Sequence, residues 1–266
     1  LCRPLPSGET NPYFTVENVW TKEQADGLLD IVKSRKSYFT AVEDSTSLVE
    51  DIGEAQDPVL VDGELLCEHP YLALNKNRTR CVLPSRIDVG RHYLLTGGRE
   101  ARKEMYSSLL SRLQVFNGFF FDKLDAPELA PLFQSADYLK KATTVCEGRT
   151  YFDPIQLGVV ISLPGQEVAM HWDVPWFFGA SRFLYPQWLL IAMQQSGLFQ
   201  SYRVPQVQGV AYLHNWVNPD TDGGEFYYYP EGTGGRSELF KAKFNNAIVL
   251  DGSVVVHGVD TFHPVK

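Results

Sequence analysis

The chain has 266 residues, of which 44% are hydrophobic, 13% aromatic and 21% charged, a composition typical of globular proteins and unlike that of disordered or fibrous chains. Its formal charge is −8 and its lysines and arginines are scattered along the sequence, so no basic tract indicates nucleic acid as a partner. The apolar runs are much shorter than the roughly 20 residues that cross a bilayer, so we expect no membrane span.

The sequence of residues 1–148 predicts entry strands and helices that support the core formed by the second half of the chain. A β-prone stretch at 13–16 is followed by Thr21 and Gln24, which match a capping box. Apolar residues then recur at helical spacing, so the sequence predicts an amphipathic helix over about 22–35 with one face toward a core.

The rest of this half predicts a loop region followed by two more helices. Residues 37–62 are acidic and rich in turn residues, and we interpret them as the solvated loop region. Helical spacing over 99–123, interrupted at Asn117-Gly118, and over 128–141 predicts the helices. His92 lies in a short β-prone run with no ligand partner at useful spacing, so we expect a structural or surface role for it.

From residue 149 onward, short β-prone runs separated by turn residues replace the helices. Their number and spacing predict a double-stranded β-helix, or jelly roll, which carries ligands in the mouth between its two sheets. A helical insert is expected at about 182–203, either as a lid or as a packing element. The expected architecture is one α+β domain over 1–266, with 1–148 as helical support and 149–266 as the jelly-roll core. The β-prone runs are 155–163, 168–172, 207–216, 225–229, 244–250 and 254–259.

The cysteines and one tripeptide bear on the compartment. The four cysteines show no CxxC spacing, which argues against a structural zinc site. Cys67 and Cys81 are spaced to close a short loop, and Asn77-Arg78-Thr79 is a formal glycosylation acceptor. These features favour a secretory or lumenal protein over a cytosolic one, and nothing in the sequence indicates an oligomeric state.

Two motifs in the second half have the composition of a metal site. His171 and Asp173 lie two positions apart at the end of a predicted strand, so their side chains point to one face. His257 comes from a strand near the end of the chain that can pair beside the first in a jelly roll. Two imidazoles and a carboxylate form the facial triad of non-haem iron sites, whereas zinc more often recruits another His or a Cys. We therefore predict these three residues as metal ligands and as the catalytic centre.

The surroundings of these ligands carry a family resemblance. The order and spacing of the motifs resemble the Fe(II)/2-oxoglutarate-dependent oxygenases, most closely their prolyl-hydroxylase-like branch, and the clear match covers about 156–266. The resemblance implies a dioxygenase that couples oxidative decarboxylation of 2-oxoglutarate to hydroxylation of a peptidyl side chain or a small molecule. Asp173 favours hydroxylation, because halogenating members have a small residue at that position. The motifs are 156–165, His171-x-Asp173, 211–213, Gly223-Gly224-Glu225-Phe226, 247–252 and His257-Gly258-Val259.

The resemblance also implies residues that bind the co-substrate. The basic residue that pairs with its distal carboxylate corresponds to Lys266, the last residue of the chain. Ser162 and Tyr212 are expected at the same cofactor site. Because the branch often has a Tyr where Ser162 stands, there is room for a different reductant, such as ascorbate. The alternative basic residues from other elements are Arg149, Arg182 and Arg203.

Trp172, Trp176 and His214 are the candidates for substrate binding. Aromatic residues near the metal motifs form either the barrel core or a flat apolar substrate cleft, and His214 is either substrate-facing or a hydrogen-bonded structural residue. Two other functions remain open. One is a jelly-roll binding module without catalysis. The other is an oxygenase acting on a modified base, against which the acidic charge balance counts.

Overall fold

The structure is a computed structural model, which describes residues 14–35, 38–40, 52–68, 72–74, 78–83, 87–102, 104, 106–113, 115–120, 135–146, 149–218, 220–232 and 234–264. Its helices are α1 (Lys22–Ser34), α3 (Ile87–Leu95), α4 (Gly98–Arg102), α5 (Tyr106–Arg112), α6 (Ala136–Val145), α7 (Gln187–Ser196) and the 3₁₀ turn η3 (Gln200–Tyr202). No helix within these ranges is long and apolar enough to cross a membrane.

The strands of the first half are β1 (Phe14–Val16), β2 (Phe39–Thr40), β3 (Ile52–Gln56), β4 (Val59–Val61), β5 (Glu64–Leu66), β6 (Ala73–Leu74), β7 (Cys81–Leu83) and β8 (Phe116–Phe120). Those of the second half are β9 (Leu157–Ile161), β10 (Val168–His171), β11 (Trp176–Phe177), β12 (Arg203–Val204), β13 (Gln208–Ala211), β14 (Phe226–Tyr229), β15 (Glu238–Phe240), β16 (Ala247–Leu250) and β17 (Val256–Val259).

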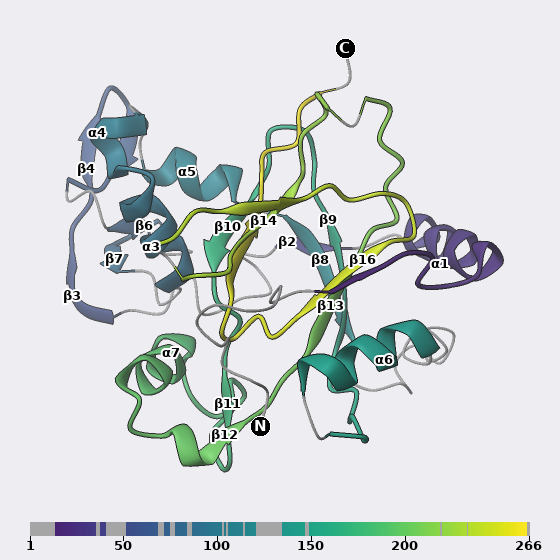
Figure 1. The fold of residues 1–266 in the computed structure, drawn as a ribbon. Helices are drawn as coiled ribbons and strands as arrows, with labels where there is room; N and C mark the ends of the chain where they lie inside the picture. The colour runs from purple at the N-terminus through teal and green to yellow at the C-terminus, as the bar shows by residue number, and fades with distance from the viewer. Residues whose placement is uncertain are drawn as a thin grey trace.

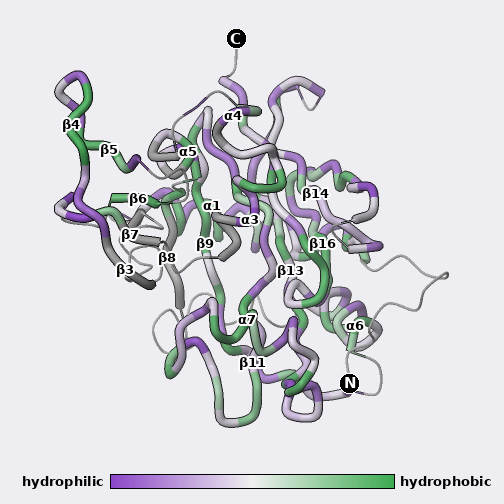
Figure 2. The backbone as a smooth tube through the Cα atoms, turned by 90° about the vertical axis from the view of Figure 1, so that its left-hand side faces the viewer, coloured by the Kyte–Doolittle hydropathy of each residue, from purple (hydrophilic) through white to green (hydrophobic). Residues whose placement is uncertain are grey.

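Two antiparallel sheets form the centre of the molecule (Figure 1). One has the strand order β10-β17-β14-β15 and the other β1-β16-β13. Three further strands, β2-β8-β9, form a third sheet, while β3-β7-β6 and the β4–β5 hairpin lie to one side, where the hairpin projects from the body of the molecule (Figure 2). The chain is therefore a mixture of helices and antiparallel sheets, as the α+β expectation requires; the jelly roll stays a prediction at this point.

The core lies on both faces of β16. Ile248 and Leu250 join a buried cluster with Phe226 and Tyr228 of the other central sheet. Ala247 and Val249 point the opposite way and pack with β1 and with side chains of α6. Since side chains alternate along a strand, a run of four apolar residues is fully buried only when both faces are covered.

Helix α1 confirms the predicted helix at 22–35. The Thr21 hydroxyl accepts a hydrogen bond from the Gln24 backbone N–H, and the Gln24 side chain accepts one from the Thr21 backbone N–H. Ala25 and Leu28 are buried, as the helical spacing required. The cap and the apolar stripe together define this element locally.

The prediction for 37–62 was wrong, and that for 99–123 was right only for its first part, which is helical in α4 and α5. Strands β2, β3 and β4 occupy described parts of the expected loop, and Asp62-Gly63, with φ of 50° and 84°, forms the turn of the β4–β5 hairpin, a two-residue turn that requires positive φ at both positions. The expected long helix is instead α4, α5 and β8. β8 is a strand because all five of its residues pair with β9, and such pairing overrides local helix propensity.

Two other expectations were met only in part. His92 has the structural role expected but lies in helix α3, not in a β-prone run. The helix predicted at 128–141 is α6, which begins at Ala136 after the Ser135 cap and ends at Val145; residues 128–134 lie outside the described part of the chain. The predicted disulfide is confirmed, because Cys67 and Cys81 are bonded. Cys146 is disulfide-bonded as well.

Candidate metal centre

Adjacent strands bring the three predicted ligands together. His171 is the last residue of β10 and Asp173 follows it, while His257 lies in β17. The two strands are antiparallel and His171 is the direct partner of His257 in the pairing. The register between them shifts after Val168, and such an irregularity re-aims a side chain at the end of a strand.

The ligand atoms converge on one point. Nε2 of His171 lies 3.6 Å from Oδ1 of Asp173, and Nε2 of His257 lies 4.0 Å from the same oxygen. All three ligand atoms lie within 4.8 Å of one another. Metal–ligand bonds of roughly 2.0–2.2 Å hold neighbouring ligand atoms about 3 Å apart, so a small closure places an ion between them. The group can therefore hold a metal ion.

Backbone carbonyls set the orientation of both imidazoles. Nδ1 of His171 lies 2.6 Å from the carbonyl oxygen of Ala169, and Nδ1 of His257 lies 2.8 Å from that of Val255. A carbonyl only accepts hydrogen bonds, so each Nδ1 carries a proton, and Nε2 is the nitrogen with the lone pair when the imidazole is neutral. This is the arrangement found in histidine ligands, whose second nitrogen is fixed by a hydrogen-bond partner.

Burial and charge set the protonation states that a metal requires. Burial, and then repulsion from His171, lower the pKa of His257 to about 4, so this imidazole is neutral at neutral pH. Burial raises the pKa of Asp173, but the contact with His171 and the charges of the two imidazoles outweigh it and leave that pKa below its usual value. A carboxylate and a neutral imidazole are the forms that bind metal ions.

The group opens toward solvent on one side. The His257 side chain is 4% exposed and that of His171 15%, whereas the Asp173 side chain is 30% exposed. An ion held here would have protein on the side of the imidazoles and free coordination positions on the other. Catalytic metal sites differ from structural ones in having such open positions.

Gly252 allows the close approach of Asp173. The Asp173 backbone N–H donates to the Gly252 carbonyl over 2.9 Å. A Cβ at position 252 would lie 2.0 Å from Oδ2 of Asp173 and 2.6 Å from Nε2 of Gln208. The glycine quoted in the family resemblance is thus required sterically, because any side chain there would displace the carboxylate.

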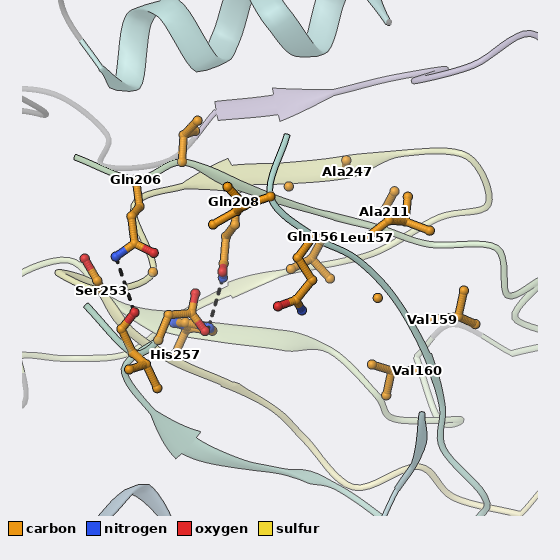
Figure 3. A pocket seen from close by; sticks show the side chains of 18 of the residues that line it. Gln156, Leu157, Val159, Val160, Gln206, Gln208, Ala211, Ala247, Ser253 and His257 are labelled. Carbon is orange, nitrogen blue, oxygen red and sulfur yellow. Dashed lines mark hydrogen bonds and ion pairs between the residues drawn. The ribbon is translucent and has the colours of Figure 1, made fainter. Parts of the chain in front are cut away.

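The sequence did not single out Gln208, which lies beside the metal group. This residue begins β13, and its Nε2 lies 3.2 Å from Nε2 of His257 (Figure 3). Gln206, labelled in the same view, donates to the carbonyl of Val174 over 3.3 Å. The position of a glutamine in a strand follows no pattern that marks it as a neighbour of a metal site. The contact of Gln208 with His257 is therefore visible only in the folded structure, where β13 pairs with β16.

A buried ion pair supports the turn before β17. Nη2 of Arg203 lies 2.6 Å from Oδ2 of Asp251 and donates to Oγ of Ser253 over 2.7 Å. Asp251 also accepts from the Ser253 backbone N–H. Arg203 is thus committed to Asp251, which argues against it as the partner of a co-substrate carboxylate.

A second buried network supports β10. The backbone N–H of Met170, next to His171, donates to Nδ1 of His92 over 3.1 Å, and Nε2 of His92 lies 2.9 Å from Oε1 of Glu167. Glu167 also forms an ion pair with Arg112 and accepts from the hydroxyl of Thr261. The network therefore joins α3 and α5 to the strand that carries a ligand.

The remaining predicted site residues line one large cleft with the metal group. Its volume is about 2460 Å³. Tyr212 is buried in its wall, and its hydroxyl has no hydrogen-bond partner within the described ranges. Burial raises the pKa of Tyr212, so the hydroxyl keeps its proton. The other predicted residues in the lining are Ser162, Trp172, Trp176 and His214, together with the alternative cations Arg149, Arg182 and Arg203.

These residues differ in their surroundings. The ring of Trp172 packs against the guanidinium of Arg91, whose Cζ lies 4.0 Å from the ring centroid, and Trp176 meets Phe183 edge-on at 5.7 Å. His214 follows β13 instead of lying within a strand, is exposed, and contacts Trp216 edge-on at 4.5 Å. Lys266, the expected partner of the distal carboxylate, lies outside the described residues.

The comparisons with known proteins add no assignment to this geometry. Neither the models of protein families nor the curated proteins compared with this sequence match it. The site is thus defined by its own residues: a partly buried His171–Asp173–His257 group, open on one side, at the wall of a large cleft.

Proposed function

We propose that the protein is a non-haem Fe(II) dioxygenase that couples oxidative decarboxylation of 2-oxoglutarate to hydroxylation of an organic substrate. The convergence of His171, Asp173 and His257 carries this proposal. Two imidazoles and one carboxylate, with an open side, are the donor set of non-haem iron oxygenases. A structural zinc site would instead be closed by four ligands, commonly including cysteines.

The strand order supports the jelly roll that this family resemblance implies. Strands β10 and β14 both pair with β17, and β15 continues the sheet from β14. The second sheet, β1-β16-β13, shares with this one a core cluster that contains Phe226 and Ile248. Two antiparallel sheets that face each other over a common core, with the ligand site at one edge, are the arrangement of a jelly roll.

The residues around the metal group fit a co-substrate with oxygen donors. Tyr212 lines the cleft, and its hydroxyl is a buried donor without a partner in the described part of the chain. The amide of Gln208 lies beside the metal ligands and can donate to an oxygen. With iron bound, dioxygen would be the oxidant: one of its oxygen atoms would convert 2-oxoglutarate into succinate and CO₂, and the other would hydroxylate the C–H bond of the substrate.

The chain's own residues would position these groups. The two imidazoles and Asp173 hold the ion on the protein side, while the cleft presents the substrate to the open side. The disulfide between Cys67 and Cys81 supports a secretory or lumenal compartment, because such bonds persist in oxidising environments.

Anaerobic reconstitution tests the proposal. Adding Fe(II) and then 2-oxoglutarate to the purified protein should produce the weak visible charge-transfer band of an iron chelate, and admitting oxygen should release succinate. Metal analysis of the same sample separates this function from a metal-free binding module. A protein that binds no Fe(II), or binds it without a band or succinate, is not this enzyme.

A further inference from the structure

One segment exposes an unusual number of large apolar side chains. Residues 176–204, which include β11, α7 and β12, form the lower-left part of the molecule in Figure 1. We call these side chains the apolar rim: Phe178 (85% exposed), Phe183 (59%), Leu184 (72%), Leu198 (79%) and Tyr202 (56%). Exposed apolar side chains that gather at one place mark a binding surface in soluble proteins, and four of these five line one cleft.

The apolar rim is fastened to the metal-bearing core. Leu190 and Ile191 of α7 are buried, and the Gln194 side chain donates to the carbonyl of Ser253. The backbone N–H of Phe178 donates to the Tyr202 carbonyl over 2.7 Å, beside the pairing of β11 with β12. The exposed side chains thus belong to a folded segment held against the turn before β17.

The rim and the metal group share one cleft. Phe178, Phe183, Leu184 and Tyr202 line the same cleft as His257. Its volume of about 2460 Å³ exceeds the roughly 300–1,000 Å³ of pockets that enclose small molecules. A cleft of this size with an apolar border suits a chain molecule that lies across it.

Charge distinguishes this cleft from the rest of the protein. The chain carries 32 acidic residues, yet residues 174–219 contain no Asp or Glu. The basic side chains of the lining are Lys33, Arg35, Arg149, Arg182 and Arg203, and its carboxylates are Asp153, Asp173 and Asp222.

One cation and one carboxylate of this set are already committed, because Arg203 is paired with Asp251 and Asp173 belongs to the metal group. Four basic side chains then stand against two carboxylates, Asp153 and Asp222. In a protein with a charge of −8, this local excess of positive charge favours an anionic occupant.

Arg182 connects the rim with the metal group. Its guanidinium donates to the side chain of Gln156, which lines the cleft, and its Cζ lies 5.6 Å from the ring centroid of Phe183. Arg182 and the three proposed metal ligands line the same cleft. An arginine in this place is suited to hold a carboxylate of a substrate that lies in the cleft.

We propose that the substrate is an acidic polypeptide segment, whose large apolar side chains rest on the apolar rim and whose carboxylate binds Arg182 close to the residue presented to the metal. This rests on the proposed function, because it names the substrate of that same site. A polypeptide fits better than a lipid surface, since four rim residues face a concave cleft and not a convex ridge.

Panning a display library of random peptides against the immobilised, Co(II)-loaded protein tests the proposal. The wild-type protein should select peptides that combine Asp or Glu with large apolar residues. Arg182→Glu should lose the acidic preference and keep the apolar one, whereas Phe183→Ser with Leu184→Ser should do the reverse. Fluorescence anisotropy with one selected peptide should show a loss of affinity of roughly 10-fold or more for Arg182→Glu, the scale of a lost charged hydrogen bond.

Leu239→Ser is the matched control, because Leu239 is 58% exposed on β15 and does not line the cleft. Selection of basic peptides, no selection at all, or an equal loss in the control would overturn the proposal. So would rim-dependent binding to phosphatidylcholine–phosphatidylserine vesicles without peptide selection. The Co(II) absorption spectrum reports the metal centre separately: its absence in the wild-type protein refutes the proposed function, whereas an intact spectrum without peptide selection refutes only the substrate class.

Discussion

His171 and His257 each direct Nδ1 to the carbonyl oxygen of the residue two positions earlier, Ala169 and Val255. The same local contact occurs on two neighbouring strands, so both rings present Nε2 to the same point. Gly252 completes the group by leaving space for the Asp173 carboxylate. At the scale of residues, metal affinity thus depends on backbone atoms as well as on the three ligands.

Removing one ligand should abolish tight metal binding. His171→Ala leaves two ligands, so its affinity for Co(II) should fall by more than the roughly 10–100-fold typical of changes to residues that support ligands. His214→Ala is the matched control, because this histidine lies in the same cleft but outside the metal group, and it should bind Co(II) as the wild type does. Titration followed by visible absorption measures both; equal affinities in the two variants would show that His171 is no ligand.

Gly252→Ala should weaken the metal site without unfolding the protein. The added Cβ would lie 2.0 Å from Oδ2 of Asp173, so the carboxylate must move, and we expect a loss of Co(II) affinity of about 10–100-fold. Gly234→Ala provides the control, since a Cβ there meets nothing within 4 Å. Calorimetric titration, with circular dichroism to verify the fold, compares the two. Unchanged affinity in Gly252→Ala would mean that Asp173 does not bind the ion.

At the scale of elements, helices stabilise the central sheet from outside. Helix α6 packs Tyr138 and Val145 against the cluster of Val16 and Val249. Burial raises the pKa of Tyr138 to about 12, as expected for a phenol enclosed by apolar neighbours. Helix α1 packs Leu28 against Leu157 and leaves its other face exposed. We therefore expect substitutions on the exposed face of α1 to be better tolerated than substitutions where α6 packs against the sheet.

Two glycine-to-alanine changes should shift stability in opposite directions. Gly27→Ala in the exposed middle of α1, where a Cβ meets nothing within 4 Å, should raise the free energy of unfolding by about 0.5–1 kcal/mol. Gly209→Ala should lower it by about 1–3 kcal/mol, because its Cβ would lie 2.5 Å from the Tyr138 ring and overpack the contact of α6 with β13. Urea denaturation measures both values, and a stabilising Gly209→Ala would contradict the tight packing of α6.

At the scale of the whole molecule, a buried charge network joins the helical half to the sheet half. Glu167 contacts His92 of α3, Arg112 of α5 and Thr261 near the end of the chain. Burial alone would raise the pKa of Glu167, but hydrogen bonds from His92 and Thr261 and the charge of Arg112 lower it to about 2. Segments far apart in the sequence thus depend on one carboxylate.

This network predicts acid sensitivity. The pKa of Glu167 is about 2 in the folded protein against 4.5 ordinarily. As the pH falls, Glu167 is therefore protonated in the unfolded state before it is protonated in the folded state, and this favours unfolding. The stabilisation of about 3 kcal/mol is complete above pH 4.5 and is lost as the pH falls toward 2. Urea denaturation at stepped pH should show a steeper loss for the wild type than for Glu167→Gln; parallel curves would contradict the role of this carboxylate.

The sequence by itself determined the elements whose signals are local. The capping box at Thr21 and the apolar run of β16 depend on a few adjacent residues, so they could be predicted from the sequence. The metal group could be predicted for a similar reason: His171 and Asp173 share one strand end, and the residue types allow few partners other than His257.

Only the tertiary structure decided the elements and contacts that depend on distant partners. β8 is a strand because β9 pairs with it, although the helical spacing of the preceding residues reaches Phe116. Gln208 reaches His257, and Arg203 reaches Asp251, across 49 and 48 positions of the chain. Such contacts have no periodicity in the sequence, since the pairing of strands and the packing of the insert bring them together only in the folded molecule.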